Sequence, residues 1–225
     1  MMITPKKEIQ NVRIVFILDK SGSMNYIKNK TVSGFNEYIE QQKAEEGDAF
    51  VTLVQFDGKV SNSYTDVRIQ DVPELQFYPN GNTALYDAVG STVASMLSQP
   101  DRFDKTIIVI MTDGEENSSR EYQHSTVMSL LNEAQNDRNW EVIFVGANID
   151  AVKTANSLGI KSGKSVTFDY DSSGADSVMK SLSVATSSMR GKSFAYASGE
   201  AFCDASLDMT KLYSNIKSGQ DVKEV

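Results

Sequence analysis

The chain has 225 residues, of which 40% are hydrophobic and 23% charged, a composition that is ordinary for a folded globular protein and too apolar for a disordered one. Its net charge of −8 and the lack of a basic run exclude the usual electrostatic basis for binding nucleic acid. A single cysteine, no signal-peptide pattern and no apolar run of ~18 residues predict an intracellular, cytoplasmic protein without a membrane span.

The first half of the chain alternates between strand and helix patterns. Residues 12–18 form an apolar run rich in β-branched residues, which predicts a strand covered on both faces. Apolar residues at helical spacing within 32–39 predict a helix after it. Residues 50–56 predict a second strand, and the Asp-Gly pair at 57–58 predicts a tight hairpin to a more polar edge strand at 59–64.

The same alternation continues in the second half of the chain. Apolar runs predict strands at residues 106–111, 140–145 and, more weakly, 165–170. Helical stripes predict helices within residues 85–97, 127–134, 175–189 and 209–216. Ser118 and Glu121 have the spacing of a capping box, so the helix over 127–134 is expected to begin soon after residue 117.

Strands that alternate with helices form βα units. The sequence therefore predicts a doubly wound, Rossmann-like α/β domain over residues 12–190, with a mostly parallel central sheet, one antiparallel edge strand and helices on both faces. Residues 1–11 are expected to be an N-terminal extension. Residues 191–225 are expected to be a C-terminal extension that packs on the domain and has a frayed end.

Three oxygen-rich loops accompany the predicted strands. Asp19, Ser21 and Ser23 alternate directly after the first strand, Thr83 precedes a strongly periodic helix, and Asp113 follows the strand at 106–111. Alternate residues of an extended segment point the same way, and loops at the carboxyl ends of parallel strands gather at one edge of the sheet. These loops are therefore candidates for a divided metal site, although each one alone could equally be a helix cap or a turn.

In their order and context, these loops resemble a known family. The segments DKSGSM (19–24), GNTALYDA (81–88) and MTDGEEN (111–117) look like the metal-ion-dependent adhesion site (MIDAS) of the von Willebrand factor type A (vWA) domain. The resemblance covers roughly residues 12–189. It implies that Asp19 and Asp113 bind an ion directly or through water, and that the hydroxyl ligands are Ser21, Ser23 and Thr83.

The resemblance also implies a function. Hard oxygen ligands suit Mg²⁺, with Mn²⁺ as the alternative, and two carboxylates with three hydroxyls leave an exchangeable position. In the family, a Glu or Asp carboxylate of a partner protein fills that position. We therefore expect a non-catalytic, metal-dependent protein-binding module, an intracellular adaptor or assembly subunit. Glu115, Glu116 and Asn117 are expected to be rim residues in contact with solvent.

The same residues bear on other functions. A phosphotransfer enzyme of the haloacid dehalogenase type also has an Asp after its first strand and Mg²⁺ beside it, but it needs a second Asp where Ser21 stands. A scaffold protein whose metal site is mainly structural remains an alternative. Residues 159–165 have the wrong glycine spacing and context for a phosphate-binding loop. The one histidine, His124, is expected to be a surface residue and not a hydrolase base.

Overall fold

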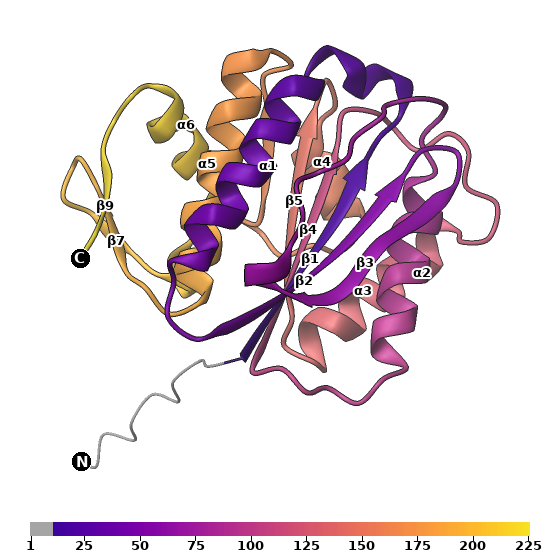
Figure 1. The fold of residues 1–225 in the computed structure, drawn as a ribbon, viewed down its shortest axis with the longest axis horizontal. Coiled ribbons are helices and arrows are strands. Elements are labelled where there is room, and N and C mark those ends of the chain that lie inside the picture. The colour runs from indigo at the N-terminus through magenta and orange to yellow at the C-terminus, as the bar shows by residue number, and fades with distance from the viewer. Residues whose placement is uncertain (1–10) are drawn as a thin grey trace.

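The computed structural model describes residues 11–225 and has the predicted doubly wound architecture (Figure 1). Residues 1–10, most of the expected N-terminal extension, lie outside the described part. The central strands are β1 (Asn11–Asp19), β2 (Asp48–Phe56), β3 (Val60–Arg68), β4 (Lys105–Thr112), β5 (Glu141–Ala147) and β6 (Ser165–Phe168). Their order in the sheet is β3-β2-β1-β4-β5-β6, and only the β2–β3 pairing at one edge is antiparallel.

Helices cover both faces of this sheet (Figure 1). They are α1 (Lys28–Lys43), α2 (Leu85–Leu97), α3 (His124–Asn136), α4 (Ala151–Ser157) and α5 (Ser172–Met189). One apolar core lies between the sheet and α1 with α5, and another lies between the sheet and α2, α3 and α4. Within residues 11–225, no helix combines the length and the apolar character that crossing a membrane requires.

Strand β1 explains why the central strands read as continuous apolar runs. Ile14 and Phe16 belong to the core under α1, whereas Val15 and Ile17 belong to the core under α2. Successive side chains of a strand point to opposite faces, so a strand with a core on each side needs apolar residues at every position. The sequence prediction of central parallel strands is confirmed.

The start of α3 differs from the prediction. The helix begins at His124, so the capping box expected at Ser118 is wrong. The carboxylate of Glu116 accepts hydrogen bonds from the Ser118 and Ser119 amides at 2.8 and 2.7 Å. The carboxylate of Asp87 accepts hydrogen bonds from the amides of residues 120–122 at 2.8 to 2.9 Å. These amides are already bonded to side chains, so the segment stays a loop until residue 124.

Three smaller differences concern other connections. The β2–β3 hairpin has a three-residue loop, because Phe56 pairs with Val60 and the Lys59 amide donates to the Asp57 carboxylate at 2.9 Å. Strand β6 ends at Phe168, two residues earlier than expected. Helix α4 was not predicted, and two short 3₁₀ turns, η1 (Gly22–Tyr26) and η2 (Ile69–Asp71), follow β1 and β3.

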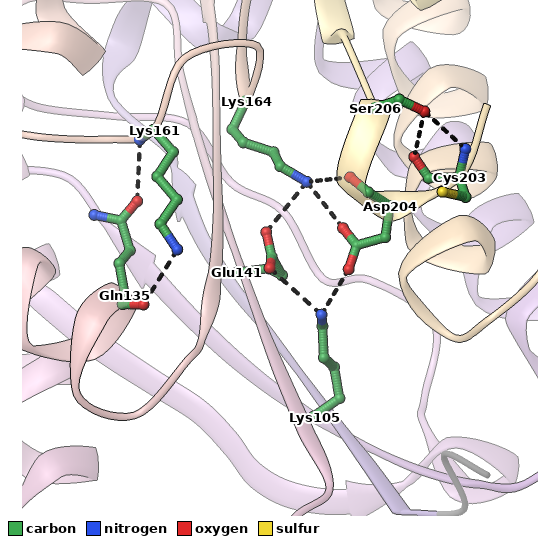
Figure 2. Close-up of polar contacts among 8 residues, drawn as sticks. All are labelled: Lys105, Gln135, Glu141, Lys161, Lys164, Cys203, Asp204 and Ser206. Carbon is green, nitrogen blue, oxygen red and sulfur yellow. Dashed lines mark hydrogen bonds and ion pairs between the residues drawn. The ribbon is translucent and has the colours of Figure 1, made fainter. Parts of the chain in front are cut away.

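Residues 159–165 connect α4 to β6, as their helix-to-strand context indicates. Gly159 has a φ of +74° at the end of the helix, a conformation that favours glycine. Gln135 of α3 holds this connection from both sides. Its Nε2 donates to the Gly159 carbonyl at 2.9 Å. Its Oε1 accepts from the Lys161 amide at 3.0 Å, a bond that Figure 2 shows. The segment is an αβ connection, and the predicted helix-to-strand context is confirmed.

The last 35 residues fold back over α5 (Figure 1). Strands β7 (Phe194–Tyr196), β8 (Ala201–Phe202) and β9 (Val222–Glu224) form a small antiparallel sheet, and η3 (Asp204–Ser206) precedes α6 (Met209–Lys217). Helix α6 packs on α5, and the side chains of Phe194, Tyr196 and Leu212 are buried in the core that α1 and α5 cover. Helix α5 therefore has protein on most of its surface.

A cluster of two lysines and two carboxylates joins this C-terminal segment to the amino ends of the central strands (Figure 2). Lys105 lies 3.4 Å from Glu141 and 2.7 Å from Asp204, and Lys164 lies 3.2 and 2.9 Å from the same two acids. Burial acts to raise the pKa of Asp204, but hydrogen bonds from Lys105 and Lys164 outweigh it, so this pKa lies below its ordinary value. The four charges compensate one another.

Asp204→Asn should lower the free energy of unfolding by about 1–3 kcal/mol at pH 7, because two largely buried lysines lose half of their compensating charge. The lowered pKa means that the carboxylate stabilises the fold fully above about pH 5, and that this contribution is lost as the pH falls through the folded-state pKa. Urea unfolding of both proteins should therefore show a stability difference that shrinks between about pH 5 and pH 3.

Asp221→Asn is the matched control in the same segment. Asp221 pairs with Lys223 at 3.1 Å, but both side chains are more than 70% exposed. Its substitution should change stability by less than about 0.5 kcal/mol at any pH. Equal effects of the two substitutions would contradict a special role for the buried cluster.

Candidate metal centre

Asp19, the last residue of β1, begins the first loop of the candidate site. Its side chain is fully buried, and both carboxylate oxygens accept hydrogen bonds. Oδ1 accepts from the Ser21 amide and Oδ2 from the Thr112 hydroxyl, each at 2.6 Å. The bond to Ser21 turns the chain out of the strand and into η1, which is the local behaviour expected of an Asp before a serine. Asp19 is therefore fixed in position from two loops.

The second loop is joined to the first through backbone bonds. The Gly22 amide donates to the Gly81 carbonyl at 3.0 Å, and the Asn80 amide donates to the Lys20 carbonyl at 2.8 Å. Gly81 has a φ of +78°, which favours glycine at this close approach. Thr83, two residues on, is 3% exposed. These bonds place Thr83 beside the first loop.

The third loop follows β4 and completes the arrangement. Asp113 is buried, and its Oδ1 accepts a hydrogen bond from the Ser23 hydroxyl at 2.7 Å and a longer one from the Ser21 hydroxyl at 3.5 Å. The two serine hydroxyls are 3.2 Å apart. The structure thus brings four of the five predicted residues into one hydrogen-bonded group around Asp113 and Asp19.

Thr83, the fifth residue, lies next to this group without a hydrogen bond to the other four. A Cβ atom added at Gly114 would come within 3.2 Å of the Thr83 Oγ1, so this hydroxyl lies against the third loop. The Thr83 amide donates a hydrogen bond to the Asn117 side-chain oxygen, and the Thr83 carbonyl accepts one from the Asn117 amide, both at 3.0 Å. All five predicted residues therefore lie at the carboxyl edge of the sheet.

The two carboxylates are electrostatically unfavourable in this arrangement. Burial raises the pKa of Asp19 to about 6; hydrogen bonds from Thr112 and Ser21 act against this rise, and the charge of Asp113 adds to it. Burial also raises the pKa of Asp113. Within residues 11–225, the buried Oδ2 atom of Asp113 has no hydrogen-bond partner. The Tyr170 hydroxyl lies close enough to act against the rise in the pKa of Asp113, but it donates its proton to the Ser23 carbonyl. A buried carboxylate oxygen without a donor is rare in proteins and indicates a place for a cation.

The donor set suits a hard divalent ion. It consists of two carboxylates and three hydroxyls, and Mg²⁺ prefers such oxygen ligands while it keeps several waters. Nowhere in residues 11–225 do three or more His, Cys, Asp or Glu side chains gather as a metal-binding group. An ion at this edge would therefore need hydroxyl ligands in addition to the two carboxylates. The unpartnered Asp113 oxygen would be one of its carboxylate ligands.

Two residues expected at the rim, Glu116 and Asn117, also have structural contacts, although Asn117 is exposed as expected. The Glu116 carboxylate accepts a hydrogen bond at 2.8 Å from the Tyr86 amide, in the first turn of α2. It also accepts the hydrogen bonds from the Ser118 and Ser119 amides described above. Asn117 holds Thr83. Only Glu115 is exposed without such contacts, as expected. An acid-rich loop is evident in the sequence, but no local pattern indicates which of its carboxylates accept hydrogen bonds from distant amides.

Thr112 was missed by the sequence analysis. Its hydroxyl donates to the Asp19 carboxylate at 2.6 Å and accepts from the Gly114 amide of the third loop at 3.1 Å. A threonine at the end of a strand is common, so its position beside Asp113 was the only available signal. His124 lies at the start of α3, where its Nε2 is 3.2 Å from the Ser157 hydroxyl.

An aromatic pair borders the candidate metal centre. The Tyr170 hydroxyl donates a hydrogen bond to the Ser23 carbonyl, and its ring lies 5.1 Å from that of Tyr26, measured between centroids. The Tyr26 side chain is 71% exposed. A large exposed ring held beside a polar site is the kind of residue found at protein interfaces.

Comparisons with known proteins bear on the family and the fold of this chain. The family model described as von Willebrand factor type A domain matches residues 14–182. A search of curated proteins found no match to the sequence. Proximal thread matrix protein 1 from the mussel byssus superposes with a TM-score of 0.55 at 18% identity, covering 79% of this chain and 48% of its own. Another structure of that protein is described as having a zinc-occupied MIDAS motif.

Two further solved structures are similar. A von Willebrand factor type A protein from Catenulispora acidiphila has a TM-score of 0.55 at 16% identity, with 84% of this chain and 45% of that chain covered. The manganese-loaded TRAP protein of Plasmodium vivax has a TM-score of 0.51 at 15% identity, with coverages of 72% and 69%. This chain spans about half the length of the mussel and Catenulispora chains. At such identities the likeness establishes the fold.

Asp113→Asn should stabilise the metal-free protein by an amount on the order of 1 kcal/mol, because it removes a buried charge whose Oδ2 lacks a partner. The amide retains an oxygen that can accept from Ser23. The measurement is urea unfolding at pH 7.5 in buffer freed of metal by a chelating resin. Glu115→Gln is the control, since it makes the same charge change at an exposed neighbouring residue and should leave stability unchanged. A clear loss of stability in Asp113→Asn would show that the carboxylate is compensated within the chain.

Proposed function

The chain belongs to the von Willebrand factor type A domain family, and from that premise we propose that it is a non-catalytic module that binds Mg²⁺ at a MIDAS and uses the ion to hold a partner protein. Domains of this family are protein-interaction modules in many proteins. One observation carries the metal part of the proposal: the buried Asp113 Oδ2 has no hydrogen-bond partner in the described part of the chain and lies beside a second buried carboxylate.

The proposed ligand set follows from the residues at this edge of the sheet. The hydroxyls of Ser21, Ser23 and Thr83 would hold the ion together with Asp113 and, directly or through water, Asp19. A divalent ion supplies two positive charges that offset the two buried carboxylates. The manganese in the Plasmodium vivax structure and the zinc in the mussel structure support a divalent metal. We propose Mg²⁺, with Mn²⁺ as the alternative, because the donors are all hard oxygens.

We propose that the partner contributes a Glu or Asp carboxylate. Two carboxylates and three hydroxyls satisfy a dication only in part, so a further anionic oxygen is the group best suited to the remaining position. The aromatic pair of Tyr26 and Tyr170 would contact the partner around that carboxylate. We place no nucleic acid and no membrane among the partners.

The proposal excludes catalysis of the haloacid dehalogenase type. A nucleophilic Asp needs an accessible oxygen, but Asp19 is fully buried and both its oxygens are hydrogen-bonded. The residue two positions later is Ser21, which is not the acid or base that such chemistry requires. A module in which the ion mainly stabilises the loops is the alternative within the family.

We further propose a division of the chain and a location. Residues 12–190 would form the vWA domain, with residues 1–11 and 191–225 as extensions, the second of which adds its own small sheet and α6. An intracellular location agrees with Cys203, a free and exposed thiol. The module would serve there as an adaptor or assembly subunit.

Mg²⁺ should raise the melting temperature of the protein, because an ion that binds only the folded state stabilises it by about 2.7 kcal/mol at a concentration 100 times its dissociation constant. Differential scanning fluorimetry with 0 to ~10 mM MgCl₂ measures the shift. Asp113→Ala should lose the shift, and the control Glu115→Ala should keep it. An unchanged melting temperature in the wild-type protein at the highest concentration would refute the metal site.

Capture of a partner should also depend on the metal. The protein on a resin should retain a partner from native lysate with Mg²⁺ present and release it with EDTA, because the proposed bond runs through the ion. Asp113→Ala should retain none of that partner, and Glu115→Ala should behave as the wild type does. Metal-dependent stability combined with EDTA-resistant capture would instead favour an ion with a purely structural role.

A further inference from the structure

A second buried charge lies at the opposite end of β1 from the candidate metal centre. Arg13 is 5% exposed, and its Nε atom is buried without a hydrogen-bond partner. Within residues 11–225, its guanidinium forms no hydrogen bond and no ion pair. Arginine is rarely buried without an anionic partner, because removing its charge from water is unfavourable. This residue therefore needs an explanation that the proposed metal site does not give.

Aromatic rings hold the guanidinium of Arg13 in place. Its central carbon lies 4.8 Å from the ring centroid of Phe103 and 5.1 Å from that of Trp140. Cation–π contacts of this kind orient the plane of the guanidinium and compensate part of its charge. They leave the N–H donors at its edge without acceptors.

The two acidic residues that attract Arg13, Asp66 and Asp101, are already bonded to other groups. The Asp66 carboxylate accepts hydrogen bonds from Arg102 at 2.6 Å and from the Thr52 hydroxyl at 3.1 Å. The Asp101 carboxylate accepts from the indole N–H of Trp140 at 2.9 Å. Burial lowers the pKa of Arg13, and these two acids oppose that effect through longer-range attraction, while Arg102 adds to it. Neither acid serves as a direct partner of Arg13.

Arg13 lines a cleft of about 150 Å³ between α2 and strands β1 to β3, whose positions are visible in Figure 1. Thr92, Ser95 and Gln99 line it from the α2 side. Within the described residues, the side chains of these three have no hydrogen-bond partner. They recur at spacings of three and four residues, so they share one face of the helix and its end. The cleft thus combines a buried guanidinium with three uncommitted polar side chains.

We propose that this cleft, which we call the Arg13 cleft, binds a compact oxyanion, either a small carboxylate or a phosphate. The planar fork of arginine donors matches the oxygens of both groups, and the hydroxyls and the amide across the cleft can donate to the remaining oxygens. A volume of about 150 Å³ is several times the ~30 Å³ that one water occupies, which admits an anion of a few heavy atoms. Asp66 also lines the cleft, but its charge is compensated by Arg102.

Calorimetric titration with sodium acetate and, separately, sodium phosphate tests this site, with sodium chloride at equal ionic strength as the blank. The buffer is freed of metal so that no ion at the candidate metal centre can bind the anion. At least one of the two anions should bind saturably with a dissociation constant on the order of 1 mM, as expected for a ligand of few atoms. The tighter of the two identifies whether a carboxylate or a phosphate is the natural class.

Two variants locate the binding. Arg13→Met removes the donors but keeps much of the packing between the rings, and it should weaken binding at least tenfold. Ser95→Leu places a larger side chain at the exposed mouth of the cleft, on a helix that tolerates leucine, and it should weaken binding similarly. Arg68→Met, which removes an arginine with a 63% exposed side chain, and Ser98→Leu, outside the cleft on the same helix end, should bind as the wild type does.

Circular dichroism shows which variants fold. If Arg13→Met does not fold, the binding measured with Ser95→Leu decides whether the anion occupies the Arg13 cleft. The proposal is overturned if neither anion binds the wild type below ~50 mM, a concentration at which a site of millimolar affinity would be nearly saturated. It is also overturned if folded Ser95→Leu or Arg13→Met binds as tightly as Ser98→Leu. Equal binding by all variants would indicate a general ion effect.

Discussion

Two carboxylates of like charge, Asp19 and Asp113, are buried together at the carboxyl edge of β1 and β4. Hydroxyls, backbone amides and Tyr170 surround them, and within residues 11–225 neither acid forms an ion pair with a lysine or arginine. The parallel pairing of β1 with β4, in which Leu18 is opposite Met111, sets both residues at the same edge. The two apolar cores must therefore stabilise a sheet whose edge contains an unfavourable pair of charges, and a bound cation would remove that cost.

Hydrogen bonds to two other acidic residues and one asparagine hold the loops around Asp19 and Asp113. Asp87 accepts three amides of the segment before α3, Glu116 accepts amides from α2 and from its own loop, and Asn117 is bonded to the backbone of Thr83. The contacts of Asp87 and Asn117, and the contact of Glu116 with Tyr86, join the start of α2 to the loop after β4. The negative charge of the sequence is thus used partly to bind backbone N–H groups, which would otherwise need water or regular secondary structure. The second and third loops consequently form one structural unit.

The sequence was sufficient for the features that depend on local pattern. Continuous apolar runs located β1, β4 and β5, because a strand with a core on both sides has no polar positions. The order and spacing of three motifs located the five oxygen-bearing residues, which the fold brings to one edge. The roles of Asp87 and Glu116 were not predictable, because their partners are about 30 residues away and an exposed acid has the same sequence pattern. Helix α4, with seven residues, is too short to give a clear helical period.

Strand β1 carries a buried charge at each end, and both charges point to the same face of the sheet. Arg13 and Asp19 are six residues apart, so they lie about 20 Å from each other on the face that α2 and α3 cover, with Val15 and Ile17 between them. Neither charge has an ion-pair partner in the described part of the chain, although acids and bases elsewhere in the fold are paired, as in the cluster of Lys105, Lys164, Glu141 and Asp204. Both are attached to the central strand of the sheet, which is the element least able to move. Groups held so rigidly lose little entropy when a ligand binds, so the fold itself supplies the preorganisation that a cation at one end and an anion at the other would require.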